Sequence, residues 1–170
     1  MDAFLAIVSR REVREYDPRP LPEAAVRRIL EAGRLAGSSR NRQARRFIVL
    51  RDRRLIEHAA ETVYAPGNLL GAPLVVAIVV SGKGPLGFDA GRAAQNMMLA
   101  AHSEGIGSCP NGVSDAVGME AVLGHAEDEQ VATLVSFGYP ARPRDPARRS
   151  PEEWIARADR LPFGQVIEER

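Results

Sequence analysis

"APLVVAIVVS" (residues 72–81) contains the longest apolar run of the chain. Its β-branched residues follow one another without the alternation of a half-buried strand, and Gly71 and Gly82 bound the run. A short continuous apolar run between glycines is typical of a strand buried inside a sheet. It is far shorter than the roughly 20 residues that a helix needs to cross a bilayer. We therefore expect a buried strand here.

Further elements are predicted on both sides of this run. "FIVL" (47–50) and "VATLVSFGYP" (131–140) are two more strand candidates. Helical spacing of apolar residues and acidic or serine caps predict a helix after Asp2 and helices over residues 22–36, 52–63 (capped by Asp52), 114–124 and 151–158. Separated strands among helices indicate an α+β fold, which we expect to form one domain over residues 1–170.

The longest predicted helix follows Asp89 and reads "AGRAAQNMMLAAHSEG". Asp89 is the expected N-cap, and Gly105 is the expected end. Alanine or glycine occupies many of its positions, so another helix can approach it closely. That neighbour is either the core of the same chain or a second copy of it.

Composition narrows the classes of function. The 170 residues are 45% hydrophobic and 26% charged, as in an ordinary globular domain, and the formal net charge of +1 argues against a nucleic-acid partner. The acidic second residue and the lack of a basic leader or an apolar span lead us to expect a cytoplasmic protein with no membrane partner. The single cysteine, Cys109, excludes an internal disulfide, and the three scattered histidines give no metal-ligand spacing.

One tempting motif is "GKGPLG" (82–87), which matches the glycine pattern of dinucleotide-binding loops. Pro85 interrupts it, and the expected helix cap, Asp89, lies two residues beyond the last glycine and would repel a phosphate. We interpret the segment as a flexible loop. No nucleophile elbow or Walker loop is present either, so an enzyme with this sequence would rely on a cofactor for its chemistry.

Four segments in the same order resemble the FMN-dependent nitroreductase family. They are "SRREVREYD" (9–17), "LAGSSRNRQARRFIVL" (35–50), "DAGRAAQNMMLAAHSEGIGSCPNG" (89–112) and "FGYPARPRDPARRSPEEW" (137–154). The resemblance extends over almost the whole chain. It implies a central mixed sheet flanked by helices, and a homodimer with two FMN sites at the interface between subunits.

The resemblance also assigns residues to the FMN phosphate. Arg10, Arg11 and Arg14 match the basic positions of the family's N-terminal R-R-S-x-R element, while Arg148 and Arg149 match its C-terminal basic pair. Guanidinium groups suit a phosphate dianion because they form bidentate, charge-assisted hydrogen bonds at any working pH. The family serine is Glu12 here, and a glutamate beside a phosphate would be repulsive.

The turn "GSSRNRQAR" (37–45) corresponds to the family's P-S-x-x-N-x-Q-P-W turn. The resemblance implies that Ser38, Ser39 and Asn41 line the ribityl chain and ring edge of a flavin held mainly by the other subunit, and that Gln43 braces the turn. The positions that depart from the family are Gly37 and Ala44, each in place of proline, and Arg45, in place of tryptophan.

Two more segments match positions around the flavin ring. Asn68 matches an asparagine at the pyrimidine edge, and Gly71 stands where many members have a lysine. In "GIGSCPNGV" (105–113), interpreted as a turn, the positions whose backbone N–H groups would meet flavin O4 and N5 are Pro110, Asn111 and Gly112.

The resemblance predicts an FMN-dependent oxidoreductase. It would take hydride from NADH or NADPH and pass it to a small acceptor, such as a nitroaromatic or a quinone, by a ping-pong mechanism with no catalytic side chain and no metal. Two alternatives stay open: a flavin-fragmenting or dehalogenating relative, and a non-catalytic binding module that retains the fold. Glu12, Arg45 and Gly71 favour the latter.

Overall fold

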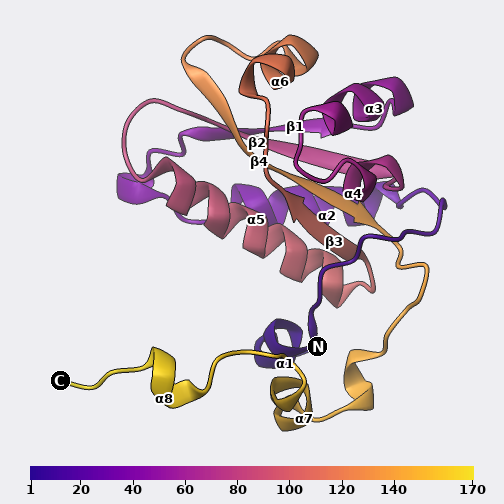
Figure 1. Ribbon diagram of the computed structural model, residues 1–170, viewed down its shortest axis with the longest axis vertical. Coiled ribbons are helices and arrows are strands. Elements are labelled where there is room, and N and C mark those ends of the chain that lie inside the picture. The colour runs from indigo at the N-terminus through magenta and orange to yellow at the C-terminus, as the bar shows by residue number, and fades with distance from the viewer. The chain divides into compact units, whose positions relative to one another are not determined.

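The computed structural model describes all 170 residues, which form two compact units. Residues 11–143 make up the larger unit, and residues 1–10 together with 144–170 make up the smaller one. The larger unit contains one sheet of four strands in the order β1-β2-β4-β3 (Figure 1). The strands are β1 (Arg45–Leu50), β2 (Leu74–Ser81), β3 (Gly107–Asn111) and β4 (Glu129–Gly138).

All neighbouring strands of this sheet are antiparallel. The α+β class is confirmed, but the expectation of a mixed sheet is wrong for this chain. A continuous apolar strand is typical of parallel sheets because helices cover both of their faces. An antiparallel strand is buried just as fully when helices cover both faces, and this is the arrangement here.

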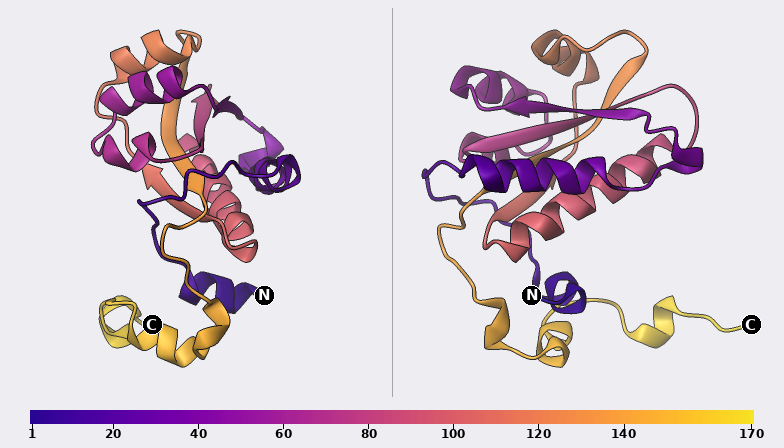
Figure 2. Two further views of the ribbon diagram at one scale, coloured as in Figure 1. Left: turned by 90° about the vertical axis from the view of Figure 1, so that its right-hand side faces the viewer. Right: turned by 180° about the vertical axis from the view of Figure 1, so that it is seen from behind.

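β2 is the centre of two hydrophobic layers. Leu74, Val76, Ile78 and Val80 belong to the core under α2 (Glu23–Arg34) and α5 (Leu86–Ser103). Val75 and Ala77 point the other way, into the core that also contains residues of α3, α4 and α6. The helices of that second layer are α3 (Arg53–Glu61), α4 (Gly67–Leu70) and α6 (Ala116–Leu123), and Figure 2 shows the two layers on opposite faces of the sheet.

Several helix ends follow the sequence signals. The Asp2 carboxylate accepts from the N–H of Phe4 at 2.9 Å, and that of Asp52 accepts from Leu55 at 3.0 Å, so both predicted caps are confirmed. Gly105 has φ +75° just beyond the end of α5, as expected of a helix-ending glycine.

The start of α5 differs from the prediction. The helix begins at Leu86 with Pro85 as its N-cap, so Asp89 lies inside the first turn and caps nothing. The loop at residues 82–87 therefore does run directly into a helix. The antiparallel sheet is the stronger reason to reject a dinucleotide fingerprint, since that motif belongs to parallel βαβ units.

The smaller unit consists of α1 (Ala3–Ser9), the 3₁₀ turn η2 (Pro146–Arg148), α7 (Pro151–Ala156) and α8 (Phe163–Val166). Within it α1 packs on α7, which begins with a capping box formed by Ser150 and Glu153. Trp154 is its buried residue and donates its ring N–H to the Pro146 carbonyl at 2.9 Å. None of the helices of the chain combines the length and the apolar character that a membrane span requires.

Candidate functional site

The turn before β1 has an uncommon backbone. Arg40, Asn41 and Gln43 all have φ between 52° and 54°, in the left-handed region that residues other than glycine rarely adopt. Ser39–Asn41 form the 3₁₀ turn η1. Conformations of this kind cost about 1–3 kcal/mol each and persist only where the surroundings fix them.

Hydrogen bonds from three directions fix this turn. The Gln43 N–H donates to Ser38 Oγ at 2.9 Å, so Gln43 braces the turn through its backbone. The Ser39 N–H donates to Asp89 Oδ2 at 2.9 Å, and Arg42 Nη1 donates to the Lys83 carbonyl at 2.8 Å. The turn is thus fastened both to itself and to the beginning of α5.

Two of the polar side chains assigned to this turn have no hydrogen-bond partner within the chain. Ser39 Oγ and the Asn41 amide make no hydrogen bond within the chain, and Asn41 is exposed. Ser38 Oγ, in contrast, is occupied by the Gln43 N–H. Ser39 and Asn41 are therefore better placed than Ser38 to contact a ligand.

Arg45, where the family turn has tryptophan, has a structural partner. Its Nη2 donates to the carbonyl of Ala36 and lies 3.5 and 3.4 Å from the carbonyls of Gly33 and Arg34. These carbonyls lie at the C-terminal end of α2, where a positive charge is favourable. Arg45 thus joins β1 to α2 through Nη2, while its Nε and Nη1 are buried without a hydrogen-bond partner.

The second group of predicted residues surrounds the end of β3. Residues 107–111 form an edge strand paired with β4, not the turn that the sequence suggested. Asn111 is only 4% exposed and donates its amide N–H to the Cys109 carbonyl at 2.9 Å. Pro110 and Gly112 on either side are exposed. Any contact of Asn111 with a ligand would therefore involve its backbone, because its side chain points into the protein.

Sequence reasoning did not single out Tyr64, which lies beside Gly112. The Tyr64 N–H donates to the Gly112 carbonyl at 3.2 Å, and a Cβ added to Gly112 would lie 3.2 Å from the Tyr64 ring. The Tyr64 side chain is nevertheless 78% exposed. An exposed aromatic residue after a helix gives no distinctive sequence signal, and only the pairing of Val63 with Val113 brings it to this edge.

The chain between Arg11 and Asp17 is bonded to the beginning of β3 and to the end of β4. The Val13 N–H donates to the Ser108 carbonyl at 3.0 Å, and the Tyr16 hydroxyl donates to the Val13 carbonyl at 2.6 Å and lies 3.0 Å from Ser136 Oγ. Burial raises the pKa of Tyr16 above its usual value, so the hydroxyl stays protonated and keeps donating. Of the two predicted arginines on this segment, Arg11 is half-buried and Arg14 is exposed.

The remaining predicted residues lie elsewhere. Asn68 is half-buried in α4, and a Cβ at Gly71 would meet no atom within 4 Å. Arg10 follows α1 in the smaller unit, where η2 ends at Arg148, and the Arg149 guanidinium lies 5.0 Å from the centre of the Trp154 ring.

α5 separates the turn from the beginning of β3 within one chain. The turn is bonded to Asp89 near the start of the helix, and β3 begins at Gly107, shortly after the helix ends at Ser103. The helix between Asp89 and Ser103 is about 20 Å long at 1.5 Å per residue. Figure 1 shows β3 beginning beside the end of α5, and Val13, between Arg11 and Arg14, is bonded to Ser108 there, so a single chain does not bring these arginines to the turn.

The model of the "Nitroreductase family" matches residues 7–80 and 86–139, which include most of the larger unit. The chain belongs to the nitroreductase family. A relative from Methanothermobacter thermautotrophicus, provisionally named an NADH dehydrogenase/NAD(P)H nitroreductase, is 33% identical over 171 residues, with 91% of this chain and 88% of that protein covered. The match confirms the family inferred from the four segments.

Solved structures of other nitroreductase-family proteins have the same fold. One from Desulfovibrio desulfuricans, determined in complex with FMN, is 26% identical, covers 100% of this chain and 98% of its own, and has a TM-score of 0.80. An FMN-dependent nitroreductase from Clostridium difficile is 25% identical, covers 90% of this chain and 96% of its own, and has a TM-score of 0.75.

Proposed function

We propose that this nitroreductase-family chain binds FMN and is an oxidoreductase that passes electrons from NADH or NADPH to a small acceptor such as a nitroaromatic or a quinone. Its family, the name of its relative from Methanothermobacter and the FMN complex of the Desulfovibrio structure support this. The observation that carries the proposal is the strained turn at residues 38–43, which leaves Ser39 Oγ and the Asn41 amide without partners.

The residues present fit the parts of FMN. Hydroxyl and amide groups without partners suit a hydroxylated ribityl chain, and the exposed backbone at Gly112 suits a ring edge that needs hydrogen-bond donors. Arg11 and Arg14 of the larger unit suit a phosphate. Arg45 donates to the Ala36 carbonyl after α2, so this substitution of the family tryptophan does not argue against an FMN site.

FMN, when bound, would supply the redox chemistry by accepting a hydride and releasing it to the acceptor. The chain itself would hold the phosphate, orient the ring and provide a slot over one ring face. Because donor and acceptor would use this slot in turn, we expect ping-pong kinetics. In the position that the resemblance implies, Gly71 would supply no positive charge at the pyrimidine edge to stabilise a reduced, anionic cofactor.

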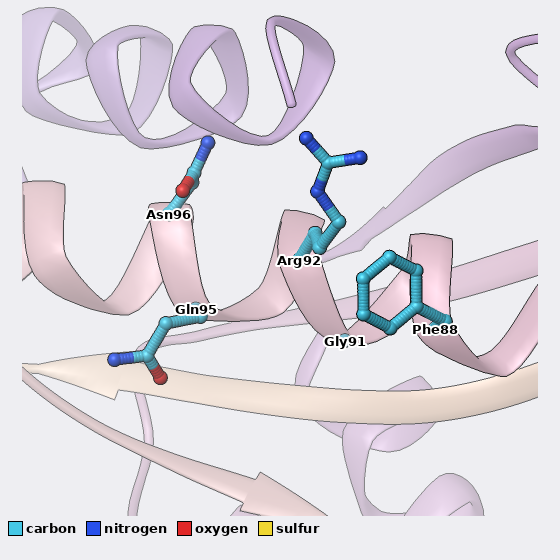
Figure 3. Close-up of a pocket in the computed structure, with 5 residues that line it drawn as sticks. All are labelled: Phe88, Gly91, Arg92, Gln95 and Asn96. Carbon is cyan, nitrogen blue, oxygen red and sulfur yellow. The ribbon is translucent and has the colours of Figure 1, made fainter. Parts of the chain in front are cut away.

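We also propose a homodimer in which each flavin site combines two chains. The support is the separation of about 20 Å along α5, which a second chain in the opposite orientation would bridge. The outer face of α5 has a hollow of about 420 Å³ lined by Phe88, Gly91, Arg92, Gln95 and Asn96. Phe88 is 67% exposed, and Figure 3 shows Arg92 and Asn96 pointing to the side of α2, away from Gln95.

The test is a visible absorption spectrum of the purified protein, recorded before and after adding NADH or NADPH without air. We expect a flavin spectrum that bleaches and then recovers when a nitroaromatic or a quinone is added. No flavin after incubation with excess FMN would contradict the proposal and favour a non-catalytic module. As a matched pair, Arg14→Ala should weaken FMN binding, whereas Arg27→Ala, on the exposed face of α2, should not.

A further inference from the structure

We infer that Asp89 is the positioning residue of the turn at residues 38–43. The inference deepens the proposed function and rests on it for the role of the turn in cofactor binding. Asp89 is 7% exposed and its Oδ2 accepts the Ser39 N–H at 2.9 Å. The bond joins residues fifty positions apart in the sequence and ends at one of the two residues whose side chains are left for a ligand.

The helix itself does not need this carboxylate. α5 begins after Pro85, and no side chain caps it. Asp89 lies in the first turn, where a negative charge is favourable, yet its carboxylate bonds to the neighbouring turn and not to the N–H groups of its own helix. An aspartate that served only α5 would be expected to use those nearer donors.

The burial of the Asp89 carboxylate is energetically unfavourable. Its Oδ1 is buried and has no hydrogen-bond partner, a situation that is unfavourable for a polar atom. A buried polar atom without a partner needs an explanation, and the bond that the other Asp89 oxygen makes supplies one. Here the other oxygen holds a turn with three left-handed residues, which would relax if it were released.

Arg92, one turn further along α5, lies beside Gly37, just before the turn. A Cβ on Gly37 would lie 2.5 Å from Arg92 Nη2, so the glycine leaves the room that the guanidinium occupies. Arg92 therefore borders the turn at Gly37, while Asp89 accepts the hydrogen bond from Ser39.

The turn provides its own readout, because Arg40 and Arg42 are exposed and trypsin cleaves after arginine. The first experiment is limited trypsinolysis of the FMN-free protein, comparing wild type with Asp89→Ala and Asp89→Asn. We expect cleavage after Arg40 or Arg42 to be about tenfold faster in Asp89→Ala, the factor that loss of one charge-assisted hydrogen bond supports. Asp89→Asn keeps a neutral acceptor and should fall between the two.

Asp115→Ala is the matched control. Asp115 also accepts a backbone N–H, that of Gly118 at 3.0 Å, but it caps α6 and does not touch the turn. It should lower the melting temperature without speeding cleavage at Arg40 or Arg42. Equal cleavage in the Asp89 variants and Asp115→Ala would overturn the inference.

The second experiment is FMN titration by fluorescence quenching. We expect the FMN dissociation constant to rise about tenfold in Asp89→Ala, less in Asp89→Asn, and not at all in Asp115→Ala. Faster cleavage in a protein whose wild type binds no FMN would support the positioning role while contradicting the proposed function. Unchanged cleavage in Asp89→Asn and Asp89→Ala, with FMN bound normally, would overturn the positioning role alone.

Discussion

Tyr64 shows how one residue can affect substrate choice without holding a cofactor. Its backbone is bonded to Gly112, but its ring is 78% exposed and has no partner in the core. An aromatic ring fixed at the rim of the proposed flavin site offers a stacking surface for a flat acceptor, and such stacking is worth about 0.5–1.5 kcal/mol.

We therefore expect Tyr64→Ala to raise the KM for a nitroaromatic acceptor about fivefold, while Tyr64→Phe stays near wild type. The measurement is steady-state kinetics at saturating NADH or NADPH, with FMN content determined from absorbance. A parallel loss of FMN from Tyr64→Ala would show instead that the ring supports the cofactor.

Gly107 shows a purely steric requirement. A Cβ there would lie 2.7–2.8 Å from three side-chain atoms of Val13, in the segment that carries Arg11 and Arg14. Gly107→Ala should lower the free energy of unfolding by about 1–3 kcal/mol because the backbone limits how far Val13 can move.

Urea denaturation of Gly107→Ala, alone and combined with Val13→Ala, tests this. The second substitution should restore part of the loss, since it removes the atoms that clash. Gly87→Ala is the control, because a Cβ at this exposed helical position meets nothing within 4 Å. If Gly87→Ala were as destabilising as Gly107→Ala, the contact with Val13 would not be the cause.

At the scale of elements, the sequence predicted the helices and strands whose apolar pattern or capping residue lies within the element itself. The apolar run of β2 and the aspartate caps of α1 and α3 could be predicted from the sequence because burial and capping depend on only a few neighbouring residues. β3 could not be predicted from the sequence, because "GSCPN" contains turn-forming residues and becomes a strand only by pairing with β4. Proline is tolerated there because β3 is an edge strand.

The candidate site was predictable to a similar degree. The residue types of the turn indicated a polar site, and the structure leaves two of its side chains without partners. Asp89 was misread as a helix cap because its real partner, Ser39, is fifty residues away, and no local pattern reveals such a bond. Tyr64 was missed for the same reason, since its position depends on the pairing of Val63 with Val113.

An ion pair links β1 to β4 beside the end of β2. Arg46 donates from Nε and Nη2 to the two Glu129 oxygens at 2.7 and 2.6 Å, and Glu129 also accepts the Ala126 N–H at 3.0 Å. The hydrogen bond with Arg46 and then that with Ala126 lower the pKa of Glu129 from 4.5 to about 2. A lowered carboxyl pKa stabilises the fold above the unfolded value, and that stabilisation is lost as the pH falls from 4.5 towards 2.

Glu129→Gln should therefore lower the melting temperature at neutral pH, and the difference from wild type should shrink as the pH falls below about 4.5. Thermal melts across this range measure it. Glu23→Gln, which breaks the pair of Glu23 with Arg51, is a control for an ordinary surface bridge because Glu23 is 75% exposed. A difference at Glu129 that stayed constant with pH would show that shape rather than charge causes the loss.

At the scale of the whole molecule, the length of α5 determines how sites can be assembled. The turn lies near its beginning and the segment with Arg11 and Arg14, which is bonded to Ser108, lies near its end, with about 20 Å of helix between them. Two chains related by a twofold axis along this face would bring the turn of one chain to this segment of the other, twice. Neither chain alone would then contain a complete site.

This arrangement predicts that two defective variants complement each other. One variant carries Arg11→Ala and Arg14→Ala, which damage the proposed phosphate side, and the other carries Ser39→Ala and Asn41→Ala, which damage the turn. A mixed dimer would hold one doubly damaged site and one site built entirely from intact residues. With random pairing, about one quarter of all sites should regain wild-type FMN affinity. FMN titration of the co-refolded mixture against each variant alone measures the recovery. If each site lay within one chain, every site in the mixture would keep a lesion and no affinity would return.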